Sequence, residues 1–344
     1  MSGPTIAVVV PNYNDIRHLP RCLRSVLDQE DGLQQLIVID DKSTDDSVAV
    51  IRSLITGDPR AQLVVNPVNF GTNKTVRDAL SQVSADYVLF LSANDFLLPG
   101  IFARARQALA RAPGAGLWSA MTWLVDEDDR PLRLHPSPVV SMRDVYLPPE
   151  TCARLAYRLG SWFAASTVIY CRESLQGIGG FDPVYGAPAD LFAALTVAGR
   201  HGAVFTPEPF AAIRIHQAGY STRTLSDVAG VERMLGELRA RAPLLAPRMF
   251  TPVFLDRTEK RFHFACIRST GAVTLPGIAE RTGAGKRFAL LAVQRLVPAA
   301  LSTTRVALAF LILRPFDILP VLWYRLLGWM FVRVRLKLRG QAAP

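Results

Sequence analysis

The stretch YVLFLSANDFLLP, residues 87–99, joins an apolar run of strand length directly to polar side chains. Three similar runs, IAVVV (6–10), LIVID (36–40) and QLVVN (62–66), are separated by segments whose apolar residues have helical spacing. Continuous apolar strands that alternate with helices are typical of parallel sheets with both faces covered. The sequence therefore predicts a Rossmann-like α/β fold, with a mostly parallel sheet and helices on both faces.

Polar residues follow each predicted strand, and ligands of such sheets bind beyond the carboxyl ends of the strands. These residues are Pro11, Asn12, Tyr13 and Asn14 after the first strand, Asp40 and Asp41 after the second, Asn69, Phe70, Gly71, Lys74 and Arg77 after the third, and Asn94 and Asp95 after the fourth. Carboxylates can accept hydrogen bonds from a base or ribose, and Lys and Arg can neutralise phosphates. The set suits a nucleoside diphosphate.

Five motifs in this order resemble family 2 of the glycosyltransferases, which have the GT-A fold. They are VVVPNYND (8–15), VIDDKSTDDS (38–47), NFGTNKTVRDAL (69–80), FLSANDFLLP (90–99) and GGFDP (179–183). The resemblance covers roughly residues 6–221 and implies an inverting transferase that uses a nucleoside-diphosphate sugar, with a UDP-sugar favoured. The chain has no Gln-x-x-Arg-Trp motif, which the processive members carry, so we expect a non-processive enzyme.

The resemblance also assigns the residues that bind the nucleotide sugar. Pro11, Asn12, Tyr13 and Asn14 match the segment that packs on base and ribose, Asp41 matches the acid that accepts from the base, and Gly71, Lys74 and Arg77 match the diphosphate segment. An alternative role for Asp41 is capping of the following helix, although nearby Ser and Asp residues already supply capping groups. Lys74 and Arg77 share one helix face, and the alternative is a solvated basic edge.

The strand tip at Asn94 and Asp95 departs from the family, which usually carries two or three acids there. By resemblance Asp95 holds Mn²⁺ or Mg²⁺ against the diphosphate, Asn94 touches the ribose or the metal, and His216 is a further metal or phosphate ligand. A neutral Asn oxygen should give weaker metal binding than a second carboxylate. A His nitrogen suits Mn²⁺ better than Mg²⁺, although a lone His is more often structural.

The segment GGFDPVYGAPADLFAALTVAGRHG (179–202) resembles the acceptor segment of the family, and it makes Asp190 the catalytic base. An inverting transfer needs one carboxylate that removes the acceptor proton as the anomeric carbon is attacked. The alternative is that Asp190 only stabilises the start of a helix. Ala189 stands where the family usually has Glu, so we expect acceptor recognition to differ from that of typical members.

The basic character of the chain lies at its C-terminal end. Residues 286–344 contain ten Lys or Arg and one acid, Asp317, and so carry +9 of the formal charge of +10. Arg residues interrupt the apolar run 288–332, and no uncharged stretch reaches the roughly 18 residues of a spanning helix. We expect helices, broken at Pro298, Pro315 and Pro320, that lie in a membrane interface and bind anionic lipid.

Two alternatives for this C-terminal part are a packed helical subdomain and an oligomer interface. Nucleic acid is a poor partner, because bulky aliphatic residues separate the cations. The final RVRLKLR (333–339) alternates charged and apolar residues, which is typical of an extended segment.

We predict three regions: a GT-A domain (1–222), a helical connecting region (223–285) and a basic, apolar membrane-interface module (286–344). The N-terminal sequence has no basic region followed by a long apolar run, so we expect a cytoplasmic protein that is peripheral on the inner face of the plasma membrane. Its acceptor would then be a glycan or a lipid-linked molecule, in polysaccharide biosynthesis for the cell envelope.

Two other functions remain open from the sequence. Asn94 and Ala189 are compatible with a non-catalytic nucleotide-sugar-binding or scaffold protein of the same fold. A nucleotidyltransferase would also have an alternating sheet architecture, but it would carry a Gly-rich loop after the first strand, and PNYNDIRHL (11–19) contains no Gly.

Overall fold

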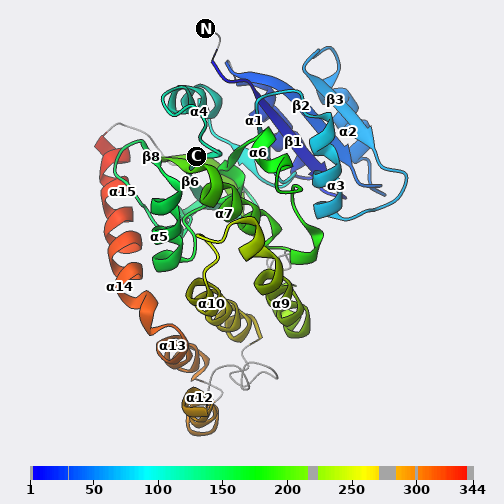
Figure 1. The fold of residues 1–344 in the computed structure, drawn as a ribbon. Coiled ribbons are helices and arrows are strands. Elements are labelled where there is room, and N and C mark those ends of the chain that lie inside the picture. Colours follow the sequence, from blue (N-terminus) through cyan, green and yellow to red (C-terminus); the bar gives the residue numbers. More distant parts are fainter. Residues whose placement is uncertain (1–2, 30, 216–223, 271–283, 299–300, 339–344) are drawn as a thin grey trace.

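A computed structural model of the chain describes residues 3–29, 31–215, 224–270, 284–298 and 301–338 (Figure 1). The strands are β1 (Ile6–Asn12), β2 (Leu33–Asp40), β3 (Ala61–Val65), β4 (Tyr87–Phe90), β5 (Phe96–Leu97), β6 (Leu117–Val125), β7 (Pro131–Leu134), β8 (Val145–Leu147), β9 (Ile169–Cys171) and β10 (Ala203–Arg214). They form one sheet in the order β3-β2-β1-β4-β9-β6-β10-β5, with β7 on β6 and β8 on β10.

The first four strands in this order, from β3 to β4, are parallel, as the sequence predicts. From β9 onward the sheet is mixed, because β9 runs antiparallel to both β4 and β6 while β6 and β10 are parallel. The parallel half places the carboxyl ends of β1, β2 and β4 at one edge, where the predicted nucleotide residues follow. The predicted fold class is confirmed.

Helices cover both faces of the sheet and extend beyond it. They are α1 (Leu19–Leu27), α2 (Ser47–Ile55), α3 (Thr72–Ala79), η1 (Leu80–Gln82), α4 (Ile101–Ala110), α5 (Pro149–Leu159), η2 (Ala165–Thr167), α6 (Arg172–Gln176), η3 (Pro183–Tyr185), α7 (Ala189–His201), α9 (Val228–Leu245), α10 (Pro252–Thr270), α12 (Ala284–Leu296), α13 (Ser302–Leu313), η5 (Pro315–Asp317), α14 (Ile318–Pro320), η6 (Val321–Leu327) and α15 (Gly328–Leu338).

Strand β1 shows why apolar runs without alternation form this sheet. Its residues Ile6, Val8 and Val10 belong to one buried cluster together with side chains of α1, α2 and α4. Its residues Ala7 and Val9 belong to a second cluster with side chains of α3, α5 and α7. Because successive side chains of a strand point to opposite faces, both sets are buried only if helices cover both sides.

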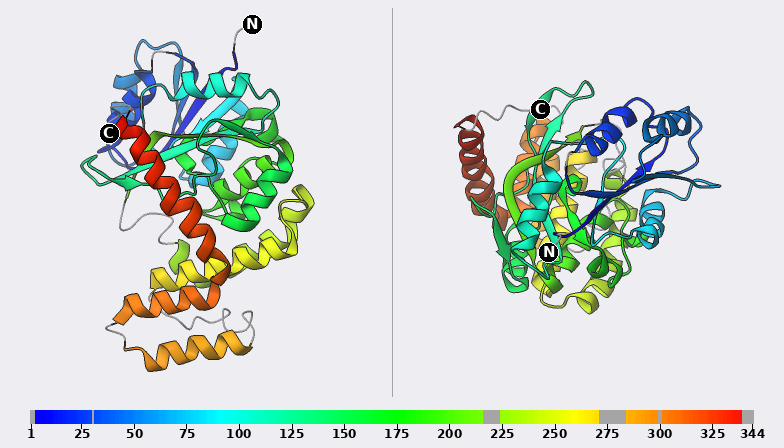
Figure 2. Two further views of the ribbon diagram at one scale, coloured as in Figure 1. Left: turned by 90° about the vertical axis from the view of Figure 1, so that its left-hand side faces the viewer. Right: turned by 90° about the horizontal axis from the view of Figure 1, so that it is seen from above.

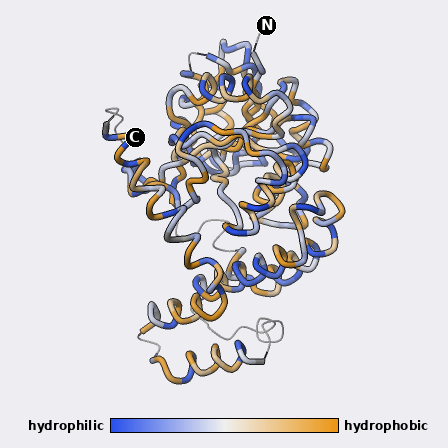
Figure 3. Tube along the Cα trace, turned by 60° about the vertical axis from the view of Figure 1, so that its left-hand side comes forward, coloured by the Kyte–Doolittle hydropathy of each residue, from blue (hydrophilic) through white to orange (hydrophobic). Residues whose placement is uncertain are grey.

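The C-terminal helices share the second of these cores. Leu290, Leu313 and Val332 are buried in the same cluster as the α7 side chains. Figure 2 shows α12 and α13 stacked below the sheet domain, while α15 runs back up its side. Figure 3 shows hydrophobic residues along both α12 and α13. The buried cluster contains residues on both sides of positions 222 and 285, and the boundaries predicted there remain predictions.

Two expectations for the C-terminal end of the chain differ from the structure. Pro320 does not stop the helical path, because a π-helical stretch, η6, continues from it into α15. The prediction of an extended RVRLKLR is wrong as far as Leu338, because α15 carries these residues as a helix. Over the described ranges, no single helix is long and apolar enough to span a membrane; α13 and the segment after it meet that criterion only as a pair bent by 89°.

Candidate active site

A cavity of about 1150 Å³ opens at the carboxyl ends of the parallel strands. Its walls come from the loops after β1, β2 and β4, from α3, α7 and α10, and from the C-terminal segment. Seven of the predicted site residues line it: Pro11, Asn12, Tyr13, Asp41, Asn94, Asp95 and Asp190. Asn14, Gly71, Lys74 and Arg77 do not line it, and His216 lies outside the described residues.

The turn after β1 is fixed by hydrogen bonds to the turn after β2. The side-chain amide of Asn12 donates to Asp40 Oδ1 at 2.8 Å and to Ser43 Oγ at 3.1 Å. Its Oδ1 is buried and has no hydrogen-bond partner among the described groups. Asn14, in the left-handed region at φ 55°, accepts from the Thr44 N–H at 2.7 Å and so acts within this turn. Neighbouring Tyr13 is 49% exposed, which leaves its ring available to a ligand.

Asp41 lies at the cavity wall but already organises a loop. Its Oδ1 accepts from Asn66 Nδ2 at 2.8 Å and from the Phe70 N–H at 3.0 Å, and its Oδ2 accepts from the Gly71 N–H at 2.8 Å. Gly71 has φ +81°, a conformation that favours glycine, directly before α3. The buried carboxylate therefore holds the loop 66–71 against β2.

Helix α3 turns its two cations away from the cavity. Thr72, Asn73, Thr75 and Val76 line the cavity, whereas Lys74 Nζ pairs with Asp78 and lies 4.3 Å from the Phe70 ring centroid. Arg77 Nε lies 3.5 Å from the same Asp78 carboxylate. In this structure both side chains form a solvated basic edge, which is the alternative given above. Their contact with a diphosphate remains a prediction.

Asp95 is buried at the tip of the fourth parallel strand, and described groups donate hydrogen bonds to both oxygens of its carboxylate. Ser166 Oγ donates to Oδ2 at 2.6 Å, and the Arg214 N–H donates to Oδ1 at 3.0 Å. The Arg214 guanidinium pairs with Asp129 and donates to the carbonyl of Asn94. The end of β10, which pairs with β5, thus fixes this strand tip.

The described residues do not form a metal cage. Among them, no group of three or more His, Cys, Asp or Glu side chains is placed to hold a metal ion. Mg²⁺ is commonly held by one or two carboxylates together with the phosphates of a substrate. Asp95, which lines the cavity beside Asn94, therefore fits a metal that arrives with a diphosphate.

Asp190 lies in the first turn of α7, and its carboxyl group borders the cavity. Surrounding protein desolvates the carboxyl group and raises its pKa to about 6, against a smaller lowering by hydrogen bonds from backbone N–H groups. The Leu191 N–H donates to its Oδ1 at 2.6 Å. An acid with this pKa is largely ionised at neutral pH and is a stronger base than an ordinary carboxylate.

The sequence predicts no role for Ser166 or Arg261 and a different role for Arg314 and Arg325, although all four line the cavity. Arg314 and Arg325 were interpreted as charges that interrupt an interfacial helix. Their position within an apolar run was the available signal, because an Arg in such surroundings either faces water or binds a partner in the interior.

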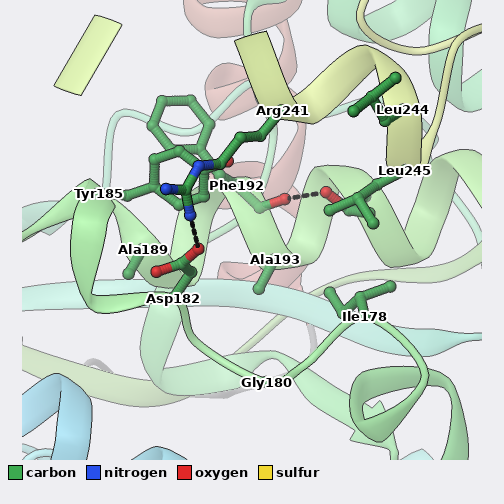
Figure 4. A pocket seen from close by; sticks show the side chains of 11 residues that line it. Ile178, Gly180, Asp182, Tyr185, Ala189, Phe192, Ala193, Arg241, Leu244 and Leu245 are labelled. Atoms are coloured by element: carbon green, nitrogen blue, oxygen red, sulfur yellow. Dashed lines mark hydrogen bonds and ion pairs between the residues drawn. The ribbon is translucent and has the colours of Figure 1, made fainter. Parts of the chain in front are cut away.

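A second, smaller cavity of about 280 Å³ lies on the other side of α7. Figure 4 shows Tyr185, Phe192, Leu244 and Leu245 around it, with Arg241 directed at Asp182. The Arg241–Asp182 pair has an N–O distance of 3.2 Å. None of the predicted site residues lines this cavity, so the larger one is the candidate active site.

Residues 7–157 match the sequence profile of Glycosyl transferase family 2. The chain carries a family 2 glycosyltransferase domain. The predicted family is thereby confirmed, and the matched range contains every predicted nucleotide-binding residue as well as Asp95.

A protein named as a glucosyltransferase is similar to part of this chain. A Campylobacter jejuni protein named GalNAc(5)-diNAcBac-PP-undecaprenol beta-1,3-glucosyltransferase is 32% identical over 106 residues, which are 30% of this chain and 34% of that protein. The chain spans about a third of the length of the curated relatives that it matches first.

Solved structures share the GT-A fold of this chain over nearly its whole length. Residues 1–349 of S. aureus TarS in complex with UDP-GlcNAc superpose with a TM-score of 0.60 at 16% identity, covering 99% of this chain and 93% of that one. The mannosyltransferase PcManGT from Pyrobaculum calidifontis, in complex with GDP-Man and Mn²⁺, has a TM-score of 0.52 at 18% identity, covering 94% and 88%.

Proposed function

We propose that the protein is an inverting, non-processive glycosyltransferase that moves a sugar from a nucleoside-diphosphate sugar to a hydroxyl group of a glycan or lipid-linked acceptor. The observation that carries this proposal is one cavity that contains both the strand-end residues Asn12, Asp41 and Asp95 and the carboxyl group of Asp190. A single displacement needs a donor bound at the strand ends and a base close to it, and this cavity can hold both.

In the proposed reaction the acceptor hydroxyl group gives its proton to the Asp190 carboxylate. The acceptor oxygen forms a bond to the anomeric carbon while the bond from that carbon to the diphosphate oxygen breaks. The nucleoside diphosphate leaves with the electron pair of that bond, and the configuration at the anomeric carbon inverts. The raised pKa of Asp190 favours this role, because it increases basicity without leaving the group protonated at neutral pH.

The proposed donor site uses the strand ends. The half-exposed ring of Tyr13 supplies a face for the base or ribose, and the orphan Oδ1 of Asn12 supplies an acceptor at the same turn. Asp95, with Asn94 and His216, would hold Mn²⁺ or Mg²⁺, which when bound neutralises charge on the diphosphate. UDP is the favoured nucleotide, and GDP is the second to test, because the two superposed structures were solved with UDP-GlcNAc and GDP-Man.

We propose that the enzyme acts at the inner face of the plasma membrane, to which it binds peripherally. Large apolar side chains are exposed on the described part of the C-terminal segment: Phe288, Leu296, Leu301, Leu311, Leu319, Trp323, Leu326, Met330, Phe331 and Val334. An apolar surface beside many cations suits a headgroup layer that contains anionic lipid. The name of the C. jejuni relative, which includes an undecaprenol-linked substrate, is compatible with a lipid-linked acceptor here.

Incubation of the purified full chain with UDP- and GDP-sugars and candidate lipid-linked acceptors tests the proposal. We expect acceptor-dependent release of the nucleoside diphosphate and loss of this release in Asp190→Asn, with nucleotide binding retained. Nucleotide binding without turnover on any acceptor would favour the non-catalytic binding protein, which the Asn at 94 and Ala at 189 also allow.

A further inference from the structure

Three arginines from the C-terminal half meet in the wall of the large cavity. Arg261 comes from α10, Arg314 from the turn after α13, and Arg325 from η6. Asp317, which is buried, pairs with two of them: Arg261 Nη2 lies 2.7 Å from Oδ1, and Arg314 Nε lies 2.7 Å from Oδ2. This set, named here the arginine cluster, brings together residues that are up to 64 positions apart, from 261 to 325.

The arginine cluster has more positive charge than its surroundings neutralise. Within the described ranges, no carboxylate lies within 4 Å of Arg325, and burial together with nearby Arg314 lowers the pKa of its guanidinium. Arg261 Nη1 is buried without a hydrogen-bond partner among the described groups. Neighbouring His135 adds no further charge to the cluster, since burial lowers its pKa to about 4 and leaves the imidazole neutral at pH 7. Three guanidinium groups therefore share one carboxylate, and such an excess is costly in a desolvated wall unless an anion binds.

The backbone around Arg325 is fixed to the sheet domain. The Val139 N–H donates to the Tyr324 carbonyl at 2.9 Å, and Trp329 Nε1 donates to the Ser137 carbonyl at 3.2 Å. Gly328 lies so close to Val139 that an added Cβ would meet the Val139 Cβ at 2.7 Å. The π-helical turn η6 is itself an uncommon conformation that is frequently found at functional sites. Arg325 is therefore held at the cavity by its neighbours.

Other arginines of the same segment show how a structural guanidinium is satisfied in this protein. Arg305 donates to the carbonyls of Val297 and Gln294 at the end of α12, at 2.7 and 2.9 Å. Arg335 donates to the Met142 carbonyl and pairs with Glu208 at 3.0 Å. These side chains have their partners within the protein, so the spare donors of Arg325 and Arg261 distinguish the arginine cluster from an ordinary structural use of arginine.

We propose that the arginine cluster of Arg261, Arg314 and Arg325 binds a phosphate group of the acceptor, in the same cavity in which the strand ends bind the donor. This proposal rests on the proposed transferase function. Guanidinium groups offer paired N–H donors that match phosphate oxygens, and an excess of two positive charges suits a diphosphate or phosphodiester better than a neutral sugar. The C-terminal helices would then select the acceptor as well as approach the membrane.

Titration of inorganic diphosphate into the full chain, with and without saturating UDP, tests the arginine cluster. Arg325→Gln is the test variant, and Arg333→Gln on the neighbouring α15, exposed and outside the cavity wall, is its matched control. We expect Arg325→Gln to weaken diphosphate binding at least about tenfold while Arg333→Gln binds as the wild type does. Thermal melts verify that both variants are folded.

Equal affinity in Arg325→Gln and Arg333→Gln would overturn the proposal, and so would diphosphate binding that UDP abolishes, since that site would be the donor end. Failure of the transferase assay alone leaves these titrations unaffected, so the two proposals fail separately. The carrier of the phosphate is then identified with phosphatidylcholine vesicles that contain a polyprenyl phosphate and, in parallel, with soluble glycerol phosphate. A defect of Arg325→Gln in either arm supports the site and names the carrier, whereas no defect in both arms contradicts it.

Discussion

Ser166 donates its hydroxyl hydrogen to Asp95 across 71 residues of sequence, with an Oγ–Oδ2 distance of 2.6 Å. The bond joins η2, at the start of β9, to the tip of the fourth parallel strand. Asp95 is buried, and this donor and the Arg214 N–H each bind one oxygen of its carboxylate at the cavity wall. The serine is thus a positioning residue for the group that we propose to hold the metal.

Removal of the carboxylate should abolish any effect of metal on nucleotide affinity. We expect Mn²⁺ to tighten UDP binding to the wild type and to leave UDP binding to Asp95→Ala unchanged, as measured by calorimetry with Mn²⁺ or a chelator. Ser166→Ala should retain part of the effect, because it removes one hydrogen bond to a charged group, which contributes about 1.5–3 kcal/mol. Identical UDP affinity with Mn²⁺ and with chelator in the wild type would show that the metal has no part in donor binding.

The pH dependence of turnover should report the ionisation of Asp190. Its pKa is raised from 3.8 to about 6, and a base acts only when deprotonated, so activity should rise through about pH 6 and level off above it. Below that value the rate should fall about tenfold for each pH unit. A rate that stays flat between pH 5 and pH 8 would contradict Asp190 as the base.

Asp190 should also make the folded protein less stable at neutral pH. A carboxyl group whose pKa is higher in the folded state than in the unfolded state binds more protons when folded, so stability falls as pH rises through about 6. Asp190→Asn removes this cost and should raise the free energy of unfolding at pH 7 by about 1–3 kcal/mol. Denaturant unfolding at pH 7 and at pH 4 checks this, and the gain should disappear at pH 4.

The positions that the sequence predicted best are those whose placement depends only on strand ends. Asn12, Asp41 and Asp95 follow apolar runs, and a parallel sheet brings the ends of such runs to one edge. Lys74 and Arg77 were harder to place, because their direction depends on the rotation of α3 about its own axis. The neighbours of Lys74 and Arg77 on α3, namely Thr72, Asn73, Thr75 and Val76, line the cavity instead. The spacing of residues in the sequence cannot show which of these helix faces is turned toward the cavity.

The arginine cluster could not be predicted from local pattern. Its residues come from three elements whose approach depends on long-range packing, including the contact of η6 with residues 137–139. In the sequence, Arg314 and Arg325 look the same as Arg305, which only binds carbonyl groups at a helix end. The alternation of charged and apolar residues in 333–339 led to a wrong prediction of an extended segment. Seven residues are too few to distinguish such a segment from the end of a helix with one exposed side.

The close contact of Gly328 with Val139 gives a prediction with opposite signs at two helical glycines. Gly→Ala in an open helix position stabilises by about 0.5–1 kcal/mol, and Gly236 on α9 is exposed with no atom within 4 Å of an added Cβ. At Gly328 the added Cβ would meet Val139 at 2.7 Å, so Gly328→Ala should instead lower stability by about 1–3 kcal/mol. Denaturant unfolding of both variants measures this difference. A stabilised Gly328→Ala would mean that α15 does not pack on the sheet domain as described.

A chain that ends at residue 285 should lose stability as well as membrane contact. Leu290, Leu313 and Val332 are buried in the core shared with the sheet domain, and each such side chain contributes about 1.5–3 kcal/mol. We therefore expect the shortened chain to melt well below the full chain and to aggregate more readily. An unchanged melting temperature would show instead that residues 286–344 form the separable module that the sequence predicted.

Membrane binding should depend on the exposed aromatic residues of the C-terminal helices as well as on their charge. Trp323 is 68% exposed and Phe331 61% exposed, so replacing both by Ser removes apolar contact area without opening the core. We expect the wild-type full chain to float with vesicles that contain anionic lipid, with high salt removing only the part of the binding due to charge. The double variant should bind roughly a hundredfold more weakly, because two apolar side chains no longer enter the interface. Leu244→Ser, at a site 83% exposed on α9, is the matched control and should float as the wild type does. Equal flotation of all three proteins, or of none, would contradict the interface. Light scattering would then show whether the same aromatic residues join copies of the chain.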